Sequence, residues 1–406
     1  MSAGRIRIGI AGMGAAGQAF IAPLRRHEGF EWVALAEPEP ALREAAQRAH
    51  GVAAYASLAA LLGHTGLDAV YLATPTPLHA EQVQQAAAAG KHVLVEKPMA
   101  TTLAEARAMV DAAERADVLL LVGHSHSFDA PIQAMRALID SGELGRVRMV
   151  NTWCFSDWLQ RPRRADELDA AQGGGVTLRQ GAHQFDIIRL LCGGLARSVR
   201  ARTFDWNPQC RAIGAHSAFI DFDDGAAATA IYNGYGGLSS MDLCFDISEW
   251  GLHQPPALRP RRAAGLTPEL ELQAKQARAG QAIADAAPHQ PFFGLTIVSC
   301  ERGDIRQSPS GLLVHGQAGV RAIEVSLLRN PRDLVLDEFH AALGGQAAAV
   351  HDGRWGLATL ELCLAAIESS RIGQELRLHE QVAPSRGGLR GVLRGVLRLD
   401  TPQAGP

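Results

Sequence analysis

Glycines near the start of the chain are spaced as a nucleotide-binding turn requires. The segment Gly12-Met13-Gly14-Ala15-Ala16-Gly17 directly follows the apolar run 6–10. In such a turn the first glycine permits the tight bend, the second lets a pyrophosphate approach the backbone, and the third lets helix and strand pack closely. The pyrophosphate then lies at the N-terminus of the next helix, where free N–H groups favour an anion. A glycine-rich turn that binds nothing is the alternative interpretation.

Glu37 makes the nucleotide interpretation more specific. It lies twenty residues after Gly17, at the end of the second predicted strand, residues 32–37. A carboxylate there accepts hydrogen bonds from the adenosine ribose hydroxyls and repels a 2′-phosphate. The following residues, 38–40, supply no arginine to bind such a phosphate. The sequence therefore predicts a site for NAD rather than NADP.

Two later segments are expected at the carboxyl ends of strands, where open α/β sheets bind their ligands. Residues 74–79 follow one predicted strand and residues 96–98 follow the next. The lysine of the second segment is one of only three in the chain, and a cis peptide to the following proline would direct it into the crevice. A solvated surface lysine is the alternative. The predicted site residues here are Thr74, Pro75, His79, Glu96 and Lys97.

His183 is a candidate proton acceptor. Oxidation of an alcohol removes a hydride from carbon and a proton from oxygen, so a base must lie within hydrogen-bond reach of the hydroxyl. His183 lies at the start of a predicted helix, residues 182–192. The positive end of that helix favours the neutral imidazole, which is the form that accepts a proton. A structural histidine that caps the helix is the alternative.

Arginines precede this histidine. Arg179 could bind a substrate carboxylate with its planar guanidinium, or it could turn away to pair with a local acid. Its charge would also disfavour protonation of Lys97 and His183. Three more arginines follow Trp158, and we expect at least one of them to face the ligand, although a surface charge run would look similar. These three are Arg161, Arg163 and Arg164.

The elements that must position these residues follow two patterns. Strands and helices alternate in the first third, which predicts an α/β Rossmann domain with a doubly wound parallel sheet over residues 1–123. Strand-like segments then follow one another, which predicts an α+β domain over 124–378 with a large, mostly antiparallel open sheet. Its predicted strands are residues 146–155, 198–206, 217–222, 226–232, 240–247, 295–300, 304–307, 312–315 and 321–325.

Two segments fall outside these patterns. Residues 249–290 begin with a Pro- and Arg-rich stretch and are interpreted as a surface insertion, a possible lid or oligomer contact. Residues 379–406 are predicted to be a disordered tail, with a small docking element as the alternative.

Composition excludes several classes of protein. The chain has 406 residues, of which 47% are hydrophobic and 20% charged, as in ordinary globular proteins. A net charge of −3 provides no basic field for nucleic acid, and no apolar run approaches a membrane span. No secretory signal is evident, and six dispersed cysteines without a C-x-x-C pair argue against a metal site. We expect a cytoplasmic protein that binds neither nucleic acid nor membrane.

Taken together, the motifs resemble those of the Gfo/Idh/MocA oxidoreductases. The matching segments are residues 12–17, 73–75 before His79, 96–99, 173–175 and 181–183, so the resemblance spans residues 1 to about 375. It implies a Rossmann domain followed by an open antiparallel α+β domain. It also implies that Lys97 and His183 flank the reacting carbon beside the nicotinamide of NAD. Many members carry an aspartate where this chain has Arg179, so the departure favours a carboxylated substrate over a neutral polyol.

A narrower resemblance concerns the branch that oxidises the 4,5-cis-dihydrodiol of phthalate to 4,5-dihydroxyphthalate. The similar segments are residues 151–158, 161–163, 173–175, 179–186, 249–251 and 291–296. This resemblance implies that Lys97 and His183 share proton transfer and positioning, and that Arg179, Arg163 and Trp158 bind substrate.

Other functions stay open on the sequence alone. One rival is a dehydrogenase of a sugar, an inositol or a ring-fission semialdehyde; another is an NAD-dependent hydrolase; a third is a non-catalytic ligand sensor. An antiparallel sheet with one open face often covers it with a second subunit, so we expect a homodimer or homotetramer.

Overall fold

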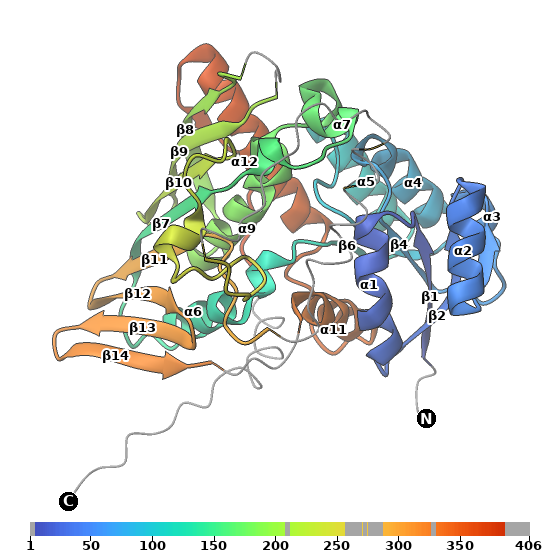
Figure 1. Cartoon of the computed structure of the whole chain (residues 1–406), viewed down its shortest axis with the longest axis horizontal. Coiled ribbons are helices and arrows are strands. Elements are labelled where there is room, and N and C mark those ends of the chain that lie inside the picture. The colour runs from blue at the N-terminus through green and yellow to red at the C-terminus, as the bar shows by residue number, and fades with distance from the viewer. Residues whose placement is uncertain are drawn as a thin grey trace, which may run out of the picture.

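The computed structural model describes residues 5–207, 212–255, 270, 274, 287–325 and 330–385. Two sheets form the framework, a parallel sheet of six strands and a sheet of nine strands (Figure 1). Among the described residues, no helix is both long and apolar enough to cross a membrane.

The first sheet is the predicted doubly wound Rossmann sheet. Its strand order is β3-β2-β1-β4-β5-β6 and all its pairs are parallel. Residues such as Ile8 and Ile10 are fully buried because helices cover both faces. Its strands are β1 (Ile6–Ala11), β2 (Phe30–Ala36), β3 (Ala53–Tyr55), β4 (Ala69–Leu72), β5 (His92–Val95) and β6 (Leu120–Val122). Its helices are α1 (Ala15–Arg26), α2 (Pro40–His50), α3 (Leu58–Leu62), α4 (Thr76–Ala88) and α5 (Leu103–Arg115).

The second sheet is large and mostly antiparallel, as predicted. Its order is β14-β13-β12-β11-β7-β10-β9-β8-β15, and β7 with β10 forms a parallel pair. The strands are β7 (Val147–Phe155), β8 (Ala196–Phe204), β9 (Ala215–Phe222), β10 (Ala227–Asn233), β11 (Leu295–Cys300), β12 (Gly303–Ser308), β13 (Gly311–Gly316), β14 (Gly319–Glu324) and β15 (Leu376–Arg377).

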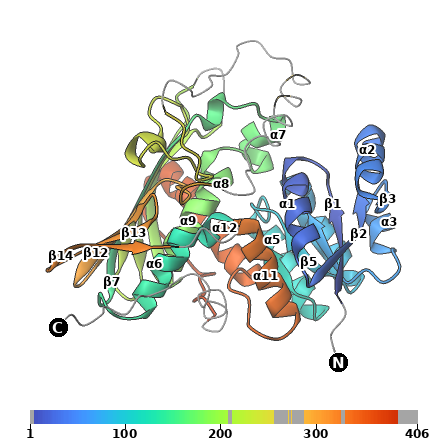
Figure 2. The ribbon, with the colours of Figure 1, turned by 60° about the horizontal axis from the view of Figure 1, so that its bottom comes forward.

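Helices lie on one side of this sheet, between it and the Rossmann domain (Figure 2). They are α6 (Ala130–Asp140), α9 (Gly181–Leu191) and α12 (Gly353–Ile372), with the short helices α7 (Ala165–Leu168) and α8 (Val176–Arg179) near the crevice. The 3₁₀ turns are η1 (His126–Phe128), η2 (Trp158–Gln160), η3 (Ala170–Gln172) and η4 (Ser240–Leu243).

One predicted strand was wrong. Residues 240–247 form the turn η4 and a tight loop instead of a strand. The Ser239 hydroxyl accepts a hydrogen bond from the Met241 amide and starts the turn, and Phe245 and Asp246 follow with φ angles of 59° and 58°. Positive φ angles are incompatible with an extended strand.

A helix from the second half of the chain completes the Rossmann core. Helix α11 (Pro331–Leu343) lies beside α1 in both views (Figures 1 and 2). Its Val335 and Phe339 are fully buried in one cluster with Phe30, and the Phe30 and Phe339 rings stack at 5.9 Å. The two halves of the chain therefore share this part of the core.

The predicted insertion and tail fall mainly outside the described residues. Of residues 249–290, the structure describes 249–255, 270, 274 and 287–290, and of the tail it describes 379–385. These tail residues pack on α12 and α9: the His379 amide donates to Glu361 of α12 at 2.6 Å, and Arg189 Nε of α9 donates to Gln381 at 2.9 Å. The disorder predicted for the tail therefore does not extend to residues 379–385.

The packing of the β1–α1 turn generates a stability prediction. A Cβ on Gly17 would lie 2.0 Å from the Gly12 carbonyl oxygen, whereas a Cβ on Gly14 meets no atom within 4 Å. Gly17→Ala should therefore lower the free energy of unfolding by about 2 kcal/mol, since the backbone must move, and Gly14→Ala should leave it nearly unchanged. Urea unfolding of both variants checks this. Equal stabilities would contradict the described packing.

Candidate active site

The glycine turn and Glu37 form one structure at the carboxyl edge of the Rossmann sheet. Gly12 has a φ of 94°, and a Cβ there would lie 2.7 Å from the Ala73 carbonyl oxygen, so only glycine fits. The Met13 amide donates to Glu37 Oε2 at 2.8 Å, and the Glu39 amide donates to Oε1 at 3.0 Å. The buried carboxylate thus connects β2 to the turn.

The turn has the features that a dinucleotide needs. Open space lies beside Gly14, and no side chain caps the N-terminus of α1, so its first amides are available to a pyrophosphate. Arg43 is a nearby cation that the sequence analysis missed, but it donates to the Glu37 carbonyl at 2.8 Å and the Pro38 carbonyl at 3.0 Å. These residues fit a bound NAD.

Two loops meet at the ends of β4 and β5. His79 lies fully buried between them, with Nε2 at 2.9 Å from the Thr74 carbonyl oxygen and Nδ1 at 3.1 Å from that of Pro98. Thr74 contacts Gln82 through its hydroxyl, and Pro75 precedes the first turn of α4. His79 therefore joins the two loops, which is a structural role beside the cofactor role predicted for it.

Lys97 follows β5 and connects the Rossmann domain to the second domain. The Lys97–Pro98 peptide is cis, as expected from the sequence. Its Nζ donates to the main-chain carbonyl of Arg179 at 2.9 Å. The pKa of Lys97 is lowered to about 8, mainly by burial; the negative charge of Glu96 opposes this shift and the positive charge of Arg179 adds to it. Glu96 in turn accepts a hydrogen bond from the Tyr71 hydroxyl at 2.6 Å.

His183 lies in the first turn of α9 and is 5% exposed. Its Nδ1 has no hydrogen-bond partner among the described residues. Burial holds its pKa well below the ordinary histidine value, and the charge of Lys97 is the next largest cause. The imidazole is therefore neutral at physiological pH and has a nitrogen available to accept a proton.

Aromatic rings surround His183. Trp250 and Phe293 lie in segments that carry the narrower resemblance, whereas the sequence analysis did not single out His126. The His126 ring lies 4.7 Å from the His183 ring in a T-shaped arrangement, measured between centroids. Phe293 lies 4.5 Å from His126 and 5.3 Å from His183, and Trp250 lies 5.4 Å from His126. His126 also lies 3.1 Å from the Asp129 carboxylate. These residues come from four distant segments, so no local motif could indicate that they meet around His183.

A buried polar network supports α9 from behind. Asp186, three residues after His183, accepts a hydrogen bond from the Trp355 indole at 2.6 Å. His351 lies 3.7 Å from Asp186 and 3.2 Å from Glu338. Although burial disfavours its charged form, these two carboxylates raise the pKa of His351 above the ordinary value. The network fixes the helix that carries His183.

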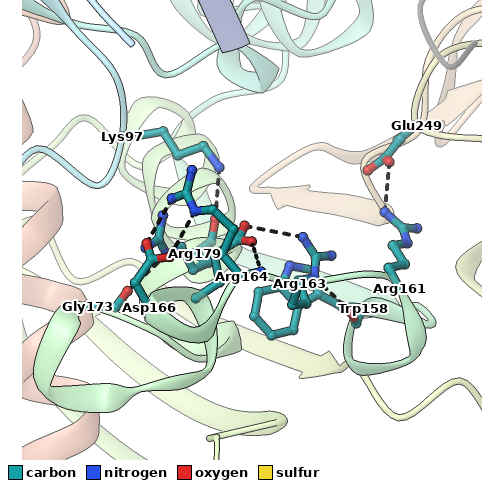
Figure 3. A network of polar contacts seen from close by, with 10 residues as sticks. Lys97, Trp158, Arg161, Arg163, Arg164, Asp166, Gly173, Arg179 and Glu249 are labelled. Atoms are coloured by element: carbon teal, nitrogen blue, oxygen red, sulfur yellow. Dashed lines mark hydrogen bonds and ion pairs between the residues drawn. The ribbon is translucent and has the colours of Figure 1, made fainter. Parts of the chain in front are cut away.

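The arginines predicted to bind substrate are engaged by the protein itself (Figure 3). Arg179 Nε donates to the Gly173 carbonyl at 3.1 Å, and Nη2 contacts Asp166 at 3.3 Å. This is the local pairing that the sequence analysis kept as its alternative. The same acid also accepts two hydrogen bonds from Arg164, both at 2.8 Å.

Arg163 and Arg161 are also held locally. The Arg163 guanidinium lies 4.1 Å from the Trp158 ring centroid, and its Nη1 lies 3.6 Å from Glu167. Arg161 contacts Asp157 at 2.7 Å, and it contacts Glu249 at 3.3 Å, as Figure 3 shows. Substrate binding by Arg179, Arg163 and Trp158 stays a prediction. Within the described part of the chain, no group of His, Cys, Asp and Glu is arranged to hold a metal ion.

Comparisons with known proteins agree with this architecture. The "Oxidoreductase family, NAD-binding Rossmann fold" matches residues 6–124, and the "GFO/IDH/MocA C-terminal domain" matches residues 132–242. A 1-carboxy-3-chloro-3,4-dihydroxycyclohexa-1,5-diene dehydrogenase of Comamonas testosteroni is 38% identical over 296 residues, covering 70% of this chain and 75% of that protein. The rhizopine catabolism protein MocA of Rhizobium meliloti is 33% identical over 49% of this chain and 61% of its own length.

Solved structures show the same fold. A putative dehydrogenase of Bordetella bronchiseptica RB50 superposes with a TM-score of 0.84 and 37% identity, covering 92% of this chain and all of that one. An oxidoreductase of Agrobacterium radiobacter, solved with NAD⁺, L-tartaric acid and magnesium, covers 92% of this chain and 98% of its own at 22% identity and a TM-score of 0.71.

The predicted fold class and NAD as the cofactor are thus confirmed, and the chain belongs to the Gfo/Idh/MocA family as an NAD-dependent dehydrogenase.

Proposed function

We propose that this dehydrogenase oxidises a cyclic cis-dihydrodiol that carries a carboxylate, with 4,5-dihydro-4,5-dihydroxyphthalate as the first candidate. The observation that carries the proposal is the pairing of Lys97 and His183, two groups able to be neutral, beside aromatic rings at the NAD edge of the sheet. The printed activity of the Comamonas relative, on a carboxylated dihydroxycyclohexadiene, supports the substrate class. A cytoplasmic location, where NAD is available, fits the reaction.

In this proposal the protein's own residues accept and transfer the protons. When bound, NAD supplies the acceptor for the hydride that leaves the ring carbon. Lys97 or His183 accepts the hydroxyl proton, and the other orients the hydroxyl by a hydrogen bond. The Arg179 carbonyl holds the Lys97 amine in the crevice. The ring ketone formed in this way then loses the proton from the neighbouring hydroxyl-bearing carbon and regains a proton on its oxygen, which gives the aromatic diol and makes the oxidation strongly downhill.

The direct experiment is to measure NADH formation with purified protein, NAD and the cis-dihydrodiol of phthalate beside a panel of sugars and inositol. Rapid NADH formation with the carboxylated diol alone would support the proposal. Oxidation of the neutral polyols instead would overturn the substrate class. Substrate consumption without net NADH would indicate the hydrolase alternative.

Replacement of Lys97 tests its role. Lys97→Ala should lower turnover by about 10²-fold or more, because a proton-transfer group is lost, while the affinity for NAD stays nearly unchanged. Lys91→Ala is a matched control, since Lys91 is also partly buried and donates to a main-chain carbonyl, that of Leu67 at 2.8 Å. Normal turnover in the Lys97 variant would make this lysine a bystander.

The pH profile separates a neutral Lys97 from a charged one. Because burial lowers the pKa of Lys97 to about 8, the neutral amine predominates above that pH, and kcat/KM should rise with pH until about 8 and then level off. His183 is already neutral throughout this range and should add no second limb. A decline in kcat/KM above pH 8 would show instead that Lys97 acts as a cation.

We also propose that two copies pack through the exposed face of the nine-stranded sheet. Met149 and Trp153 on β7 and Phe219 on β9 lie on this face, and their side chains are 44%, 41% and 46% exposed. The strand register places Ile231 and Leu295 beside Trp153 and so extends this apolar patch.

Charged substitutions on the patch test this interface. The double change Trp153→Glu with Phe219→Glu should convert the oligomer to a smaller species in light scattering, because two buried carboxylates would oppose association. Leu195→Glu is the control, since Leu195 is similarly exposed, at 40%, but precedes β8 outside the patch. An unchanged mass for the double variant would exclude this face.

A further inference from the structure

Arg332 is a cation at the crevice that the function described so far does not use. It lies in the first turn of α11, which packs beside α1. Its guanidinium carbon lies 5.2 Å from the Trp250 ring centroid and 5.9 Å from that of Phe20. The Nη1 atom is buried without a hydrogen-bond partner, and the guanidinium makes no hydrogen bond or ion pair within the part of the chain that the structure describes.

The acids near Arg332 contact other groups. Glu96, Asp129 and Glu249 all act on the guanidinium electrostatically. Glu96 accepts hydrogen bonds from the Tyr71 hydroxyl and the Lys97 amide, Asp129 contacts the His126 ring, and Glu249 contacts Arg161. A desolvated guanidinium without a close anion is costly, whereas a carboxylate ligand would form two charge-assisted hydrogen bonds with it.

Arg332 belongs to the same crevice as the proposed proton acceptor. Its charge contributes to lowering the pKa of His183, after burial and the charges of Lys97 and two other histidines. Trp250 contacts both Arg332 and His126, and Phe293 lies against His126 and His183. A wall of flat rings therefore extends from the guanidinium to His183.

We propose that Arg332 binds the ring carboxylate of the substrate, with the ring itself packed against His126, Trp250 and Phe293. The inference rests on the proposed function and names the residue that selects carboxylated rings. Arg332 suits this role better than Arg179, because the Arg179 guanidinium already contacts Asp166 and the Gly173 carbonyl. Two rings hold the Arg332 guanidinium in place, which limits the entropy lost on binding.

The pyrophosphate of NAD is the other anion that this guanidinium could bind. The glycine turn already provides backbone amides for that group, and Arg332 lies on the side of Glu96, Asp129 and His183. The two candidate anions predict different effects of replacing Arg332. If Arg332 binds the substrate carboxylate, the KM for the diol changes, and if it binds the pyrophosphate, the Kd for NAD changes.

The kinetic test compares two diols. Arg332→Gln should lower kcat/KM for the cis-dihydrodiol of phthalate by about 50-fold, mainly through KM, since a charge-assisted carboxylate contact is lost. It should leave kcat/KM for the uncarboxylated cis-dihydrodiol of benzene within about threefold, and NAD affinity unchanged. For the carboxylated diol, kcat/KM of Arg332→Lys should lie between those of wild type and Arg332→Gln, because a lysine cannot bind both carboxylate oxygens in the same plane.

Control variants make the outcome decisive. Arg354→Gln removes an exposed arginine that pairs with Glu114 at 2.6 Å. It should leave kcat/KM for both diols unchanged. Arg179→Gln tests the rival residue. The proposal is overturned if Arg332→Gln lowers kcat/KM equally for both diols, or if it weakens NAD binding instead. It is also overturned if only Arg179→Gln raises the KM for the carboxylated diol. If Arg332→Gln does not fold, the selectivity of Arg332→Lys between the two diols decides.

A binding measurement separates this inference from the proposed function. Phthalate and its neutral diamide are titrated by calorimetry into the full chain loaded with NAD. If wild type oxidises neither diol, the proposed function fails, yet phthalate binding that weakens about 50-fold in Arg332→Gln would still support the carboxylate site. Failure of phthalate to bind in preference to the diamide would overturn it.

Discussion

The hydrogen bond from Lys97 Nζ to the Arg179 carbonyl is the contact on which the candidate site depends. Lys97 follows β5 of the Rossmann sheet, and Arg179 ends α8 in the second domain, so this 2.9 Å bond crosses the crevice between them. Because the acceptor is a main-chain carbonyl, this contact does not depend on where the Arg179 side chain points. The side chain contacts Asp166, while the main-chain carbonyl of the same residue accepts the hydrogen bond from the amine.

Burial then gives the two candidate bases their chemical character. A charged amine or imidazolium loses hydration in the crevice, so both groups shift toward their neutral forms. The positive charge of Lys97 also lowers the pKa of His183 further. The two groups therefore do not carry a positive charge together at neutral pH, and at least one proton acceptor is always available.

The sequence predicted the fold and the cofactor turn well because these depend on local patterns. Alternating apolar runs and the spacing from Gly12 to Glu37 are contained in the first third of the chain, and the structure joins Glu37 to the Met13 amide. The strand predicted at 240–247 failed because a serine cap and two residues with positive φ outweighed its apolar composition. Likewise, α11 packs on a sheet formed some 300 residues earlier, and no local pattern indicates such a partner.

The arginines show most clearly what the sequence could not supply. Arg161, Arg163, Arg164 and Arg179 attract attention because they cluster near His183, but each contacts an acid in the folded chain. Clustered cations draw acids to themselves in a stable protein, since a desolvated charge without a partner is costly. Arg332 lies far from every motif in the sequence, and its guanidinium makes no close contact with an acid within the described residues. An arginine that is unpaired beside aromatic rings has a guanidinium that an anionic ligand can bind.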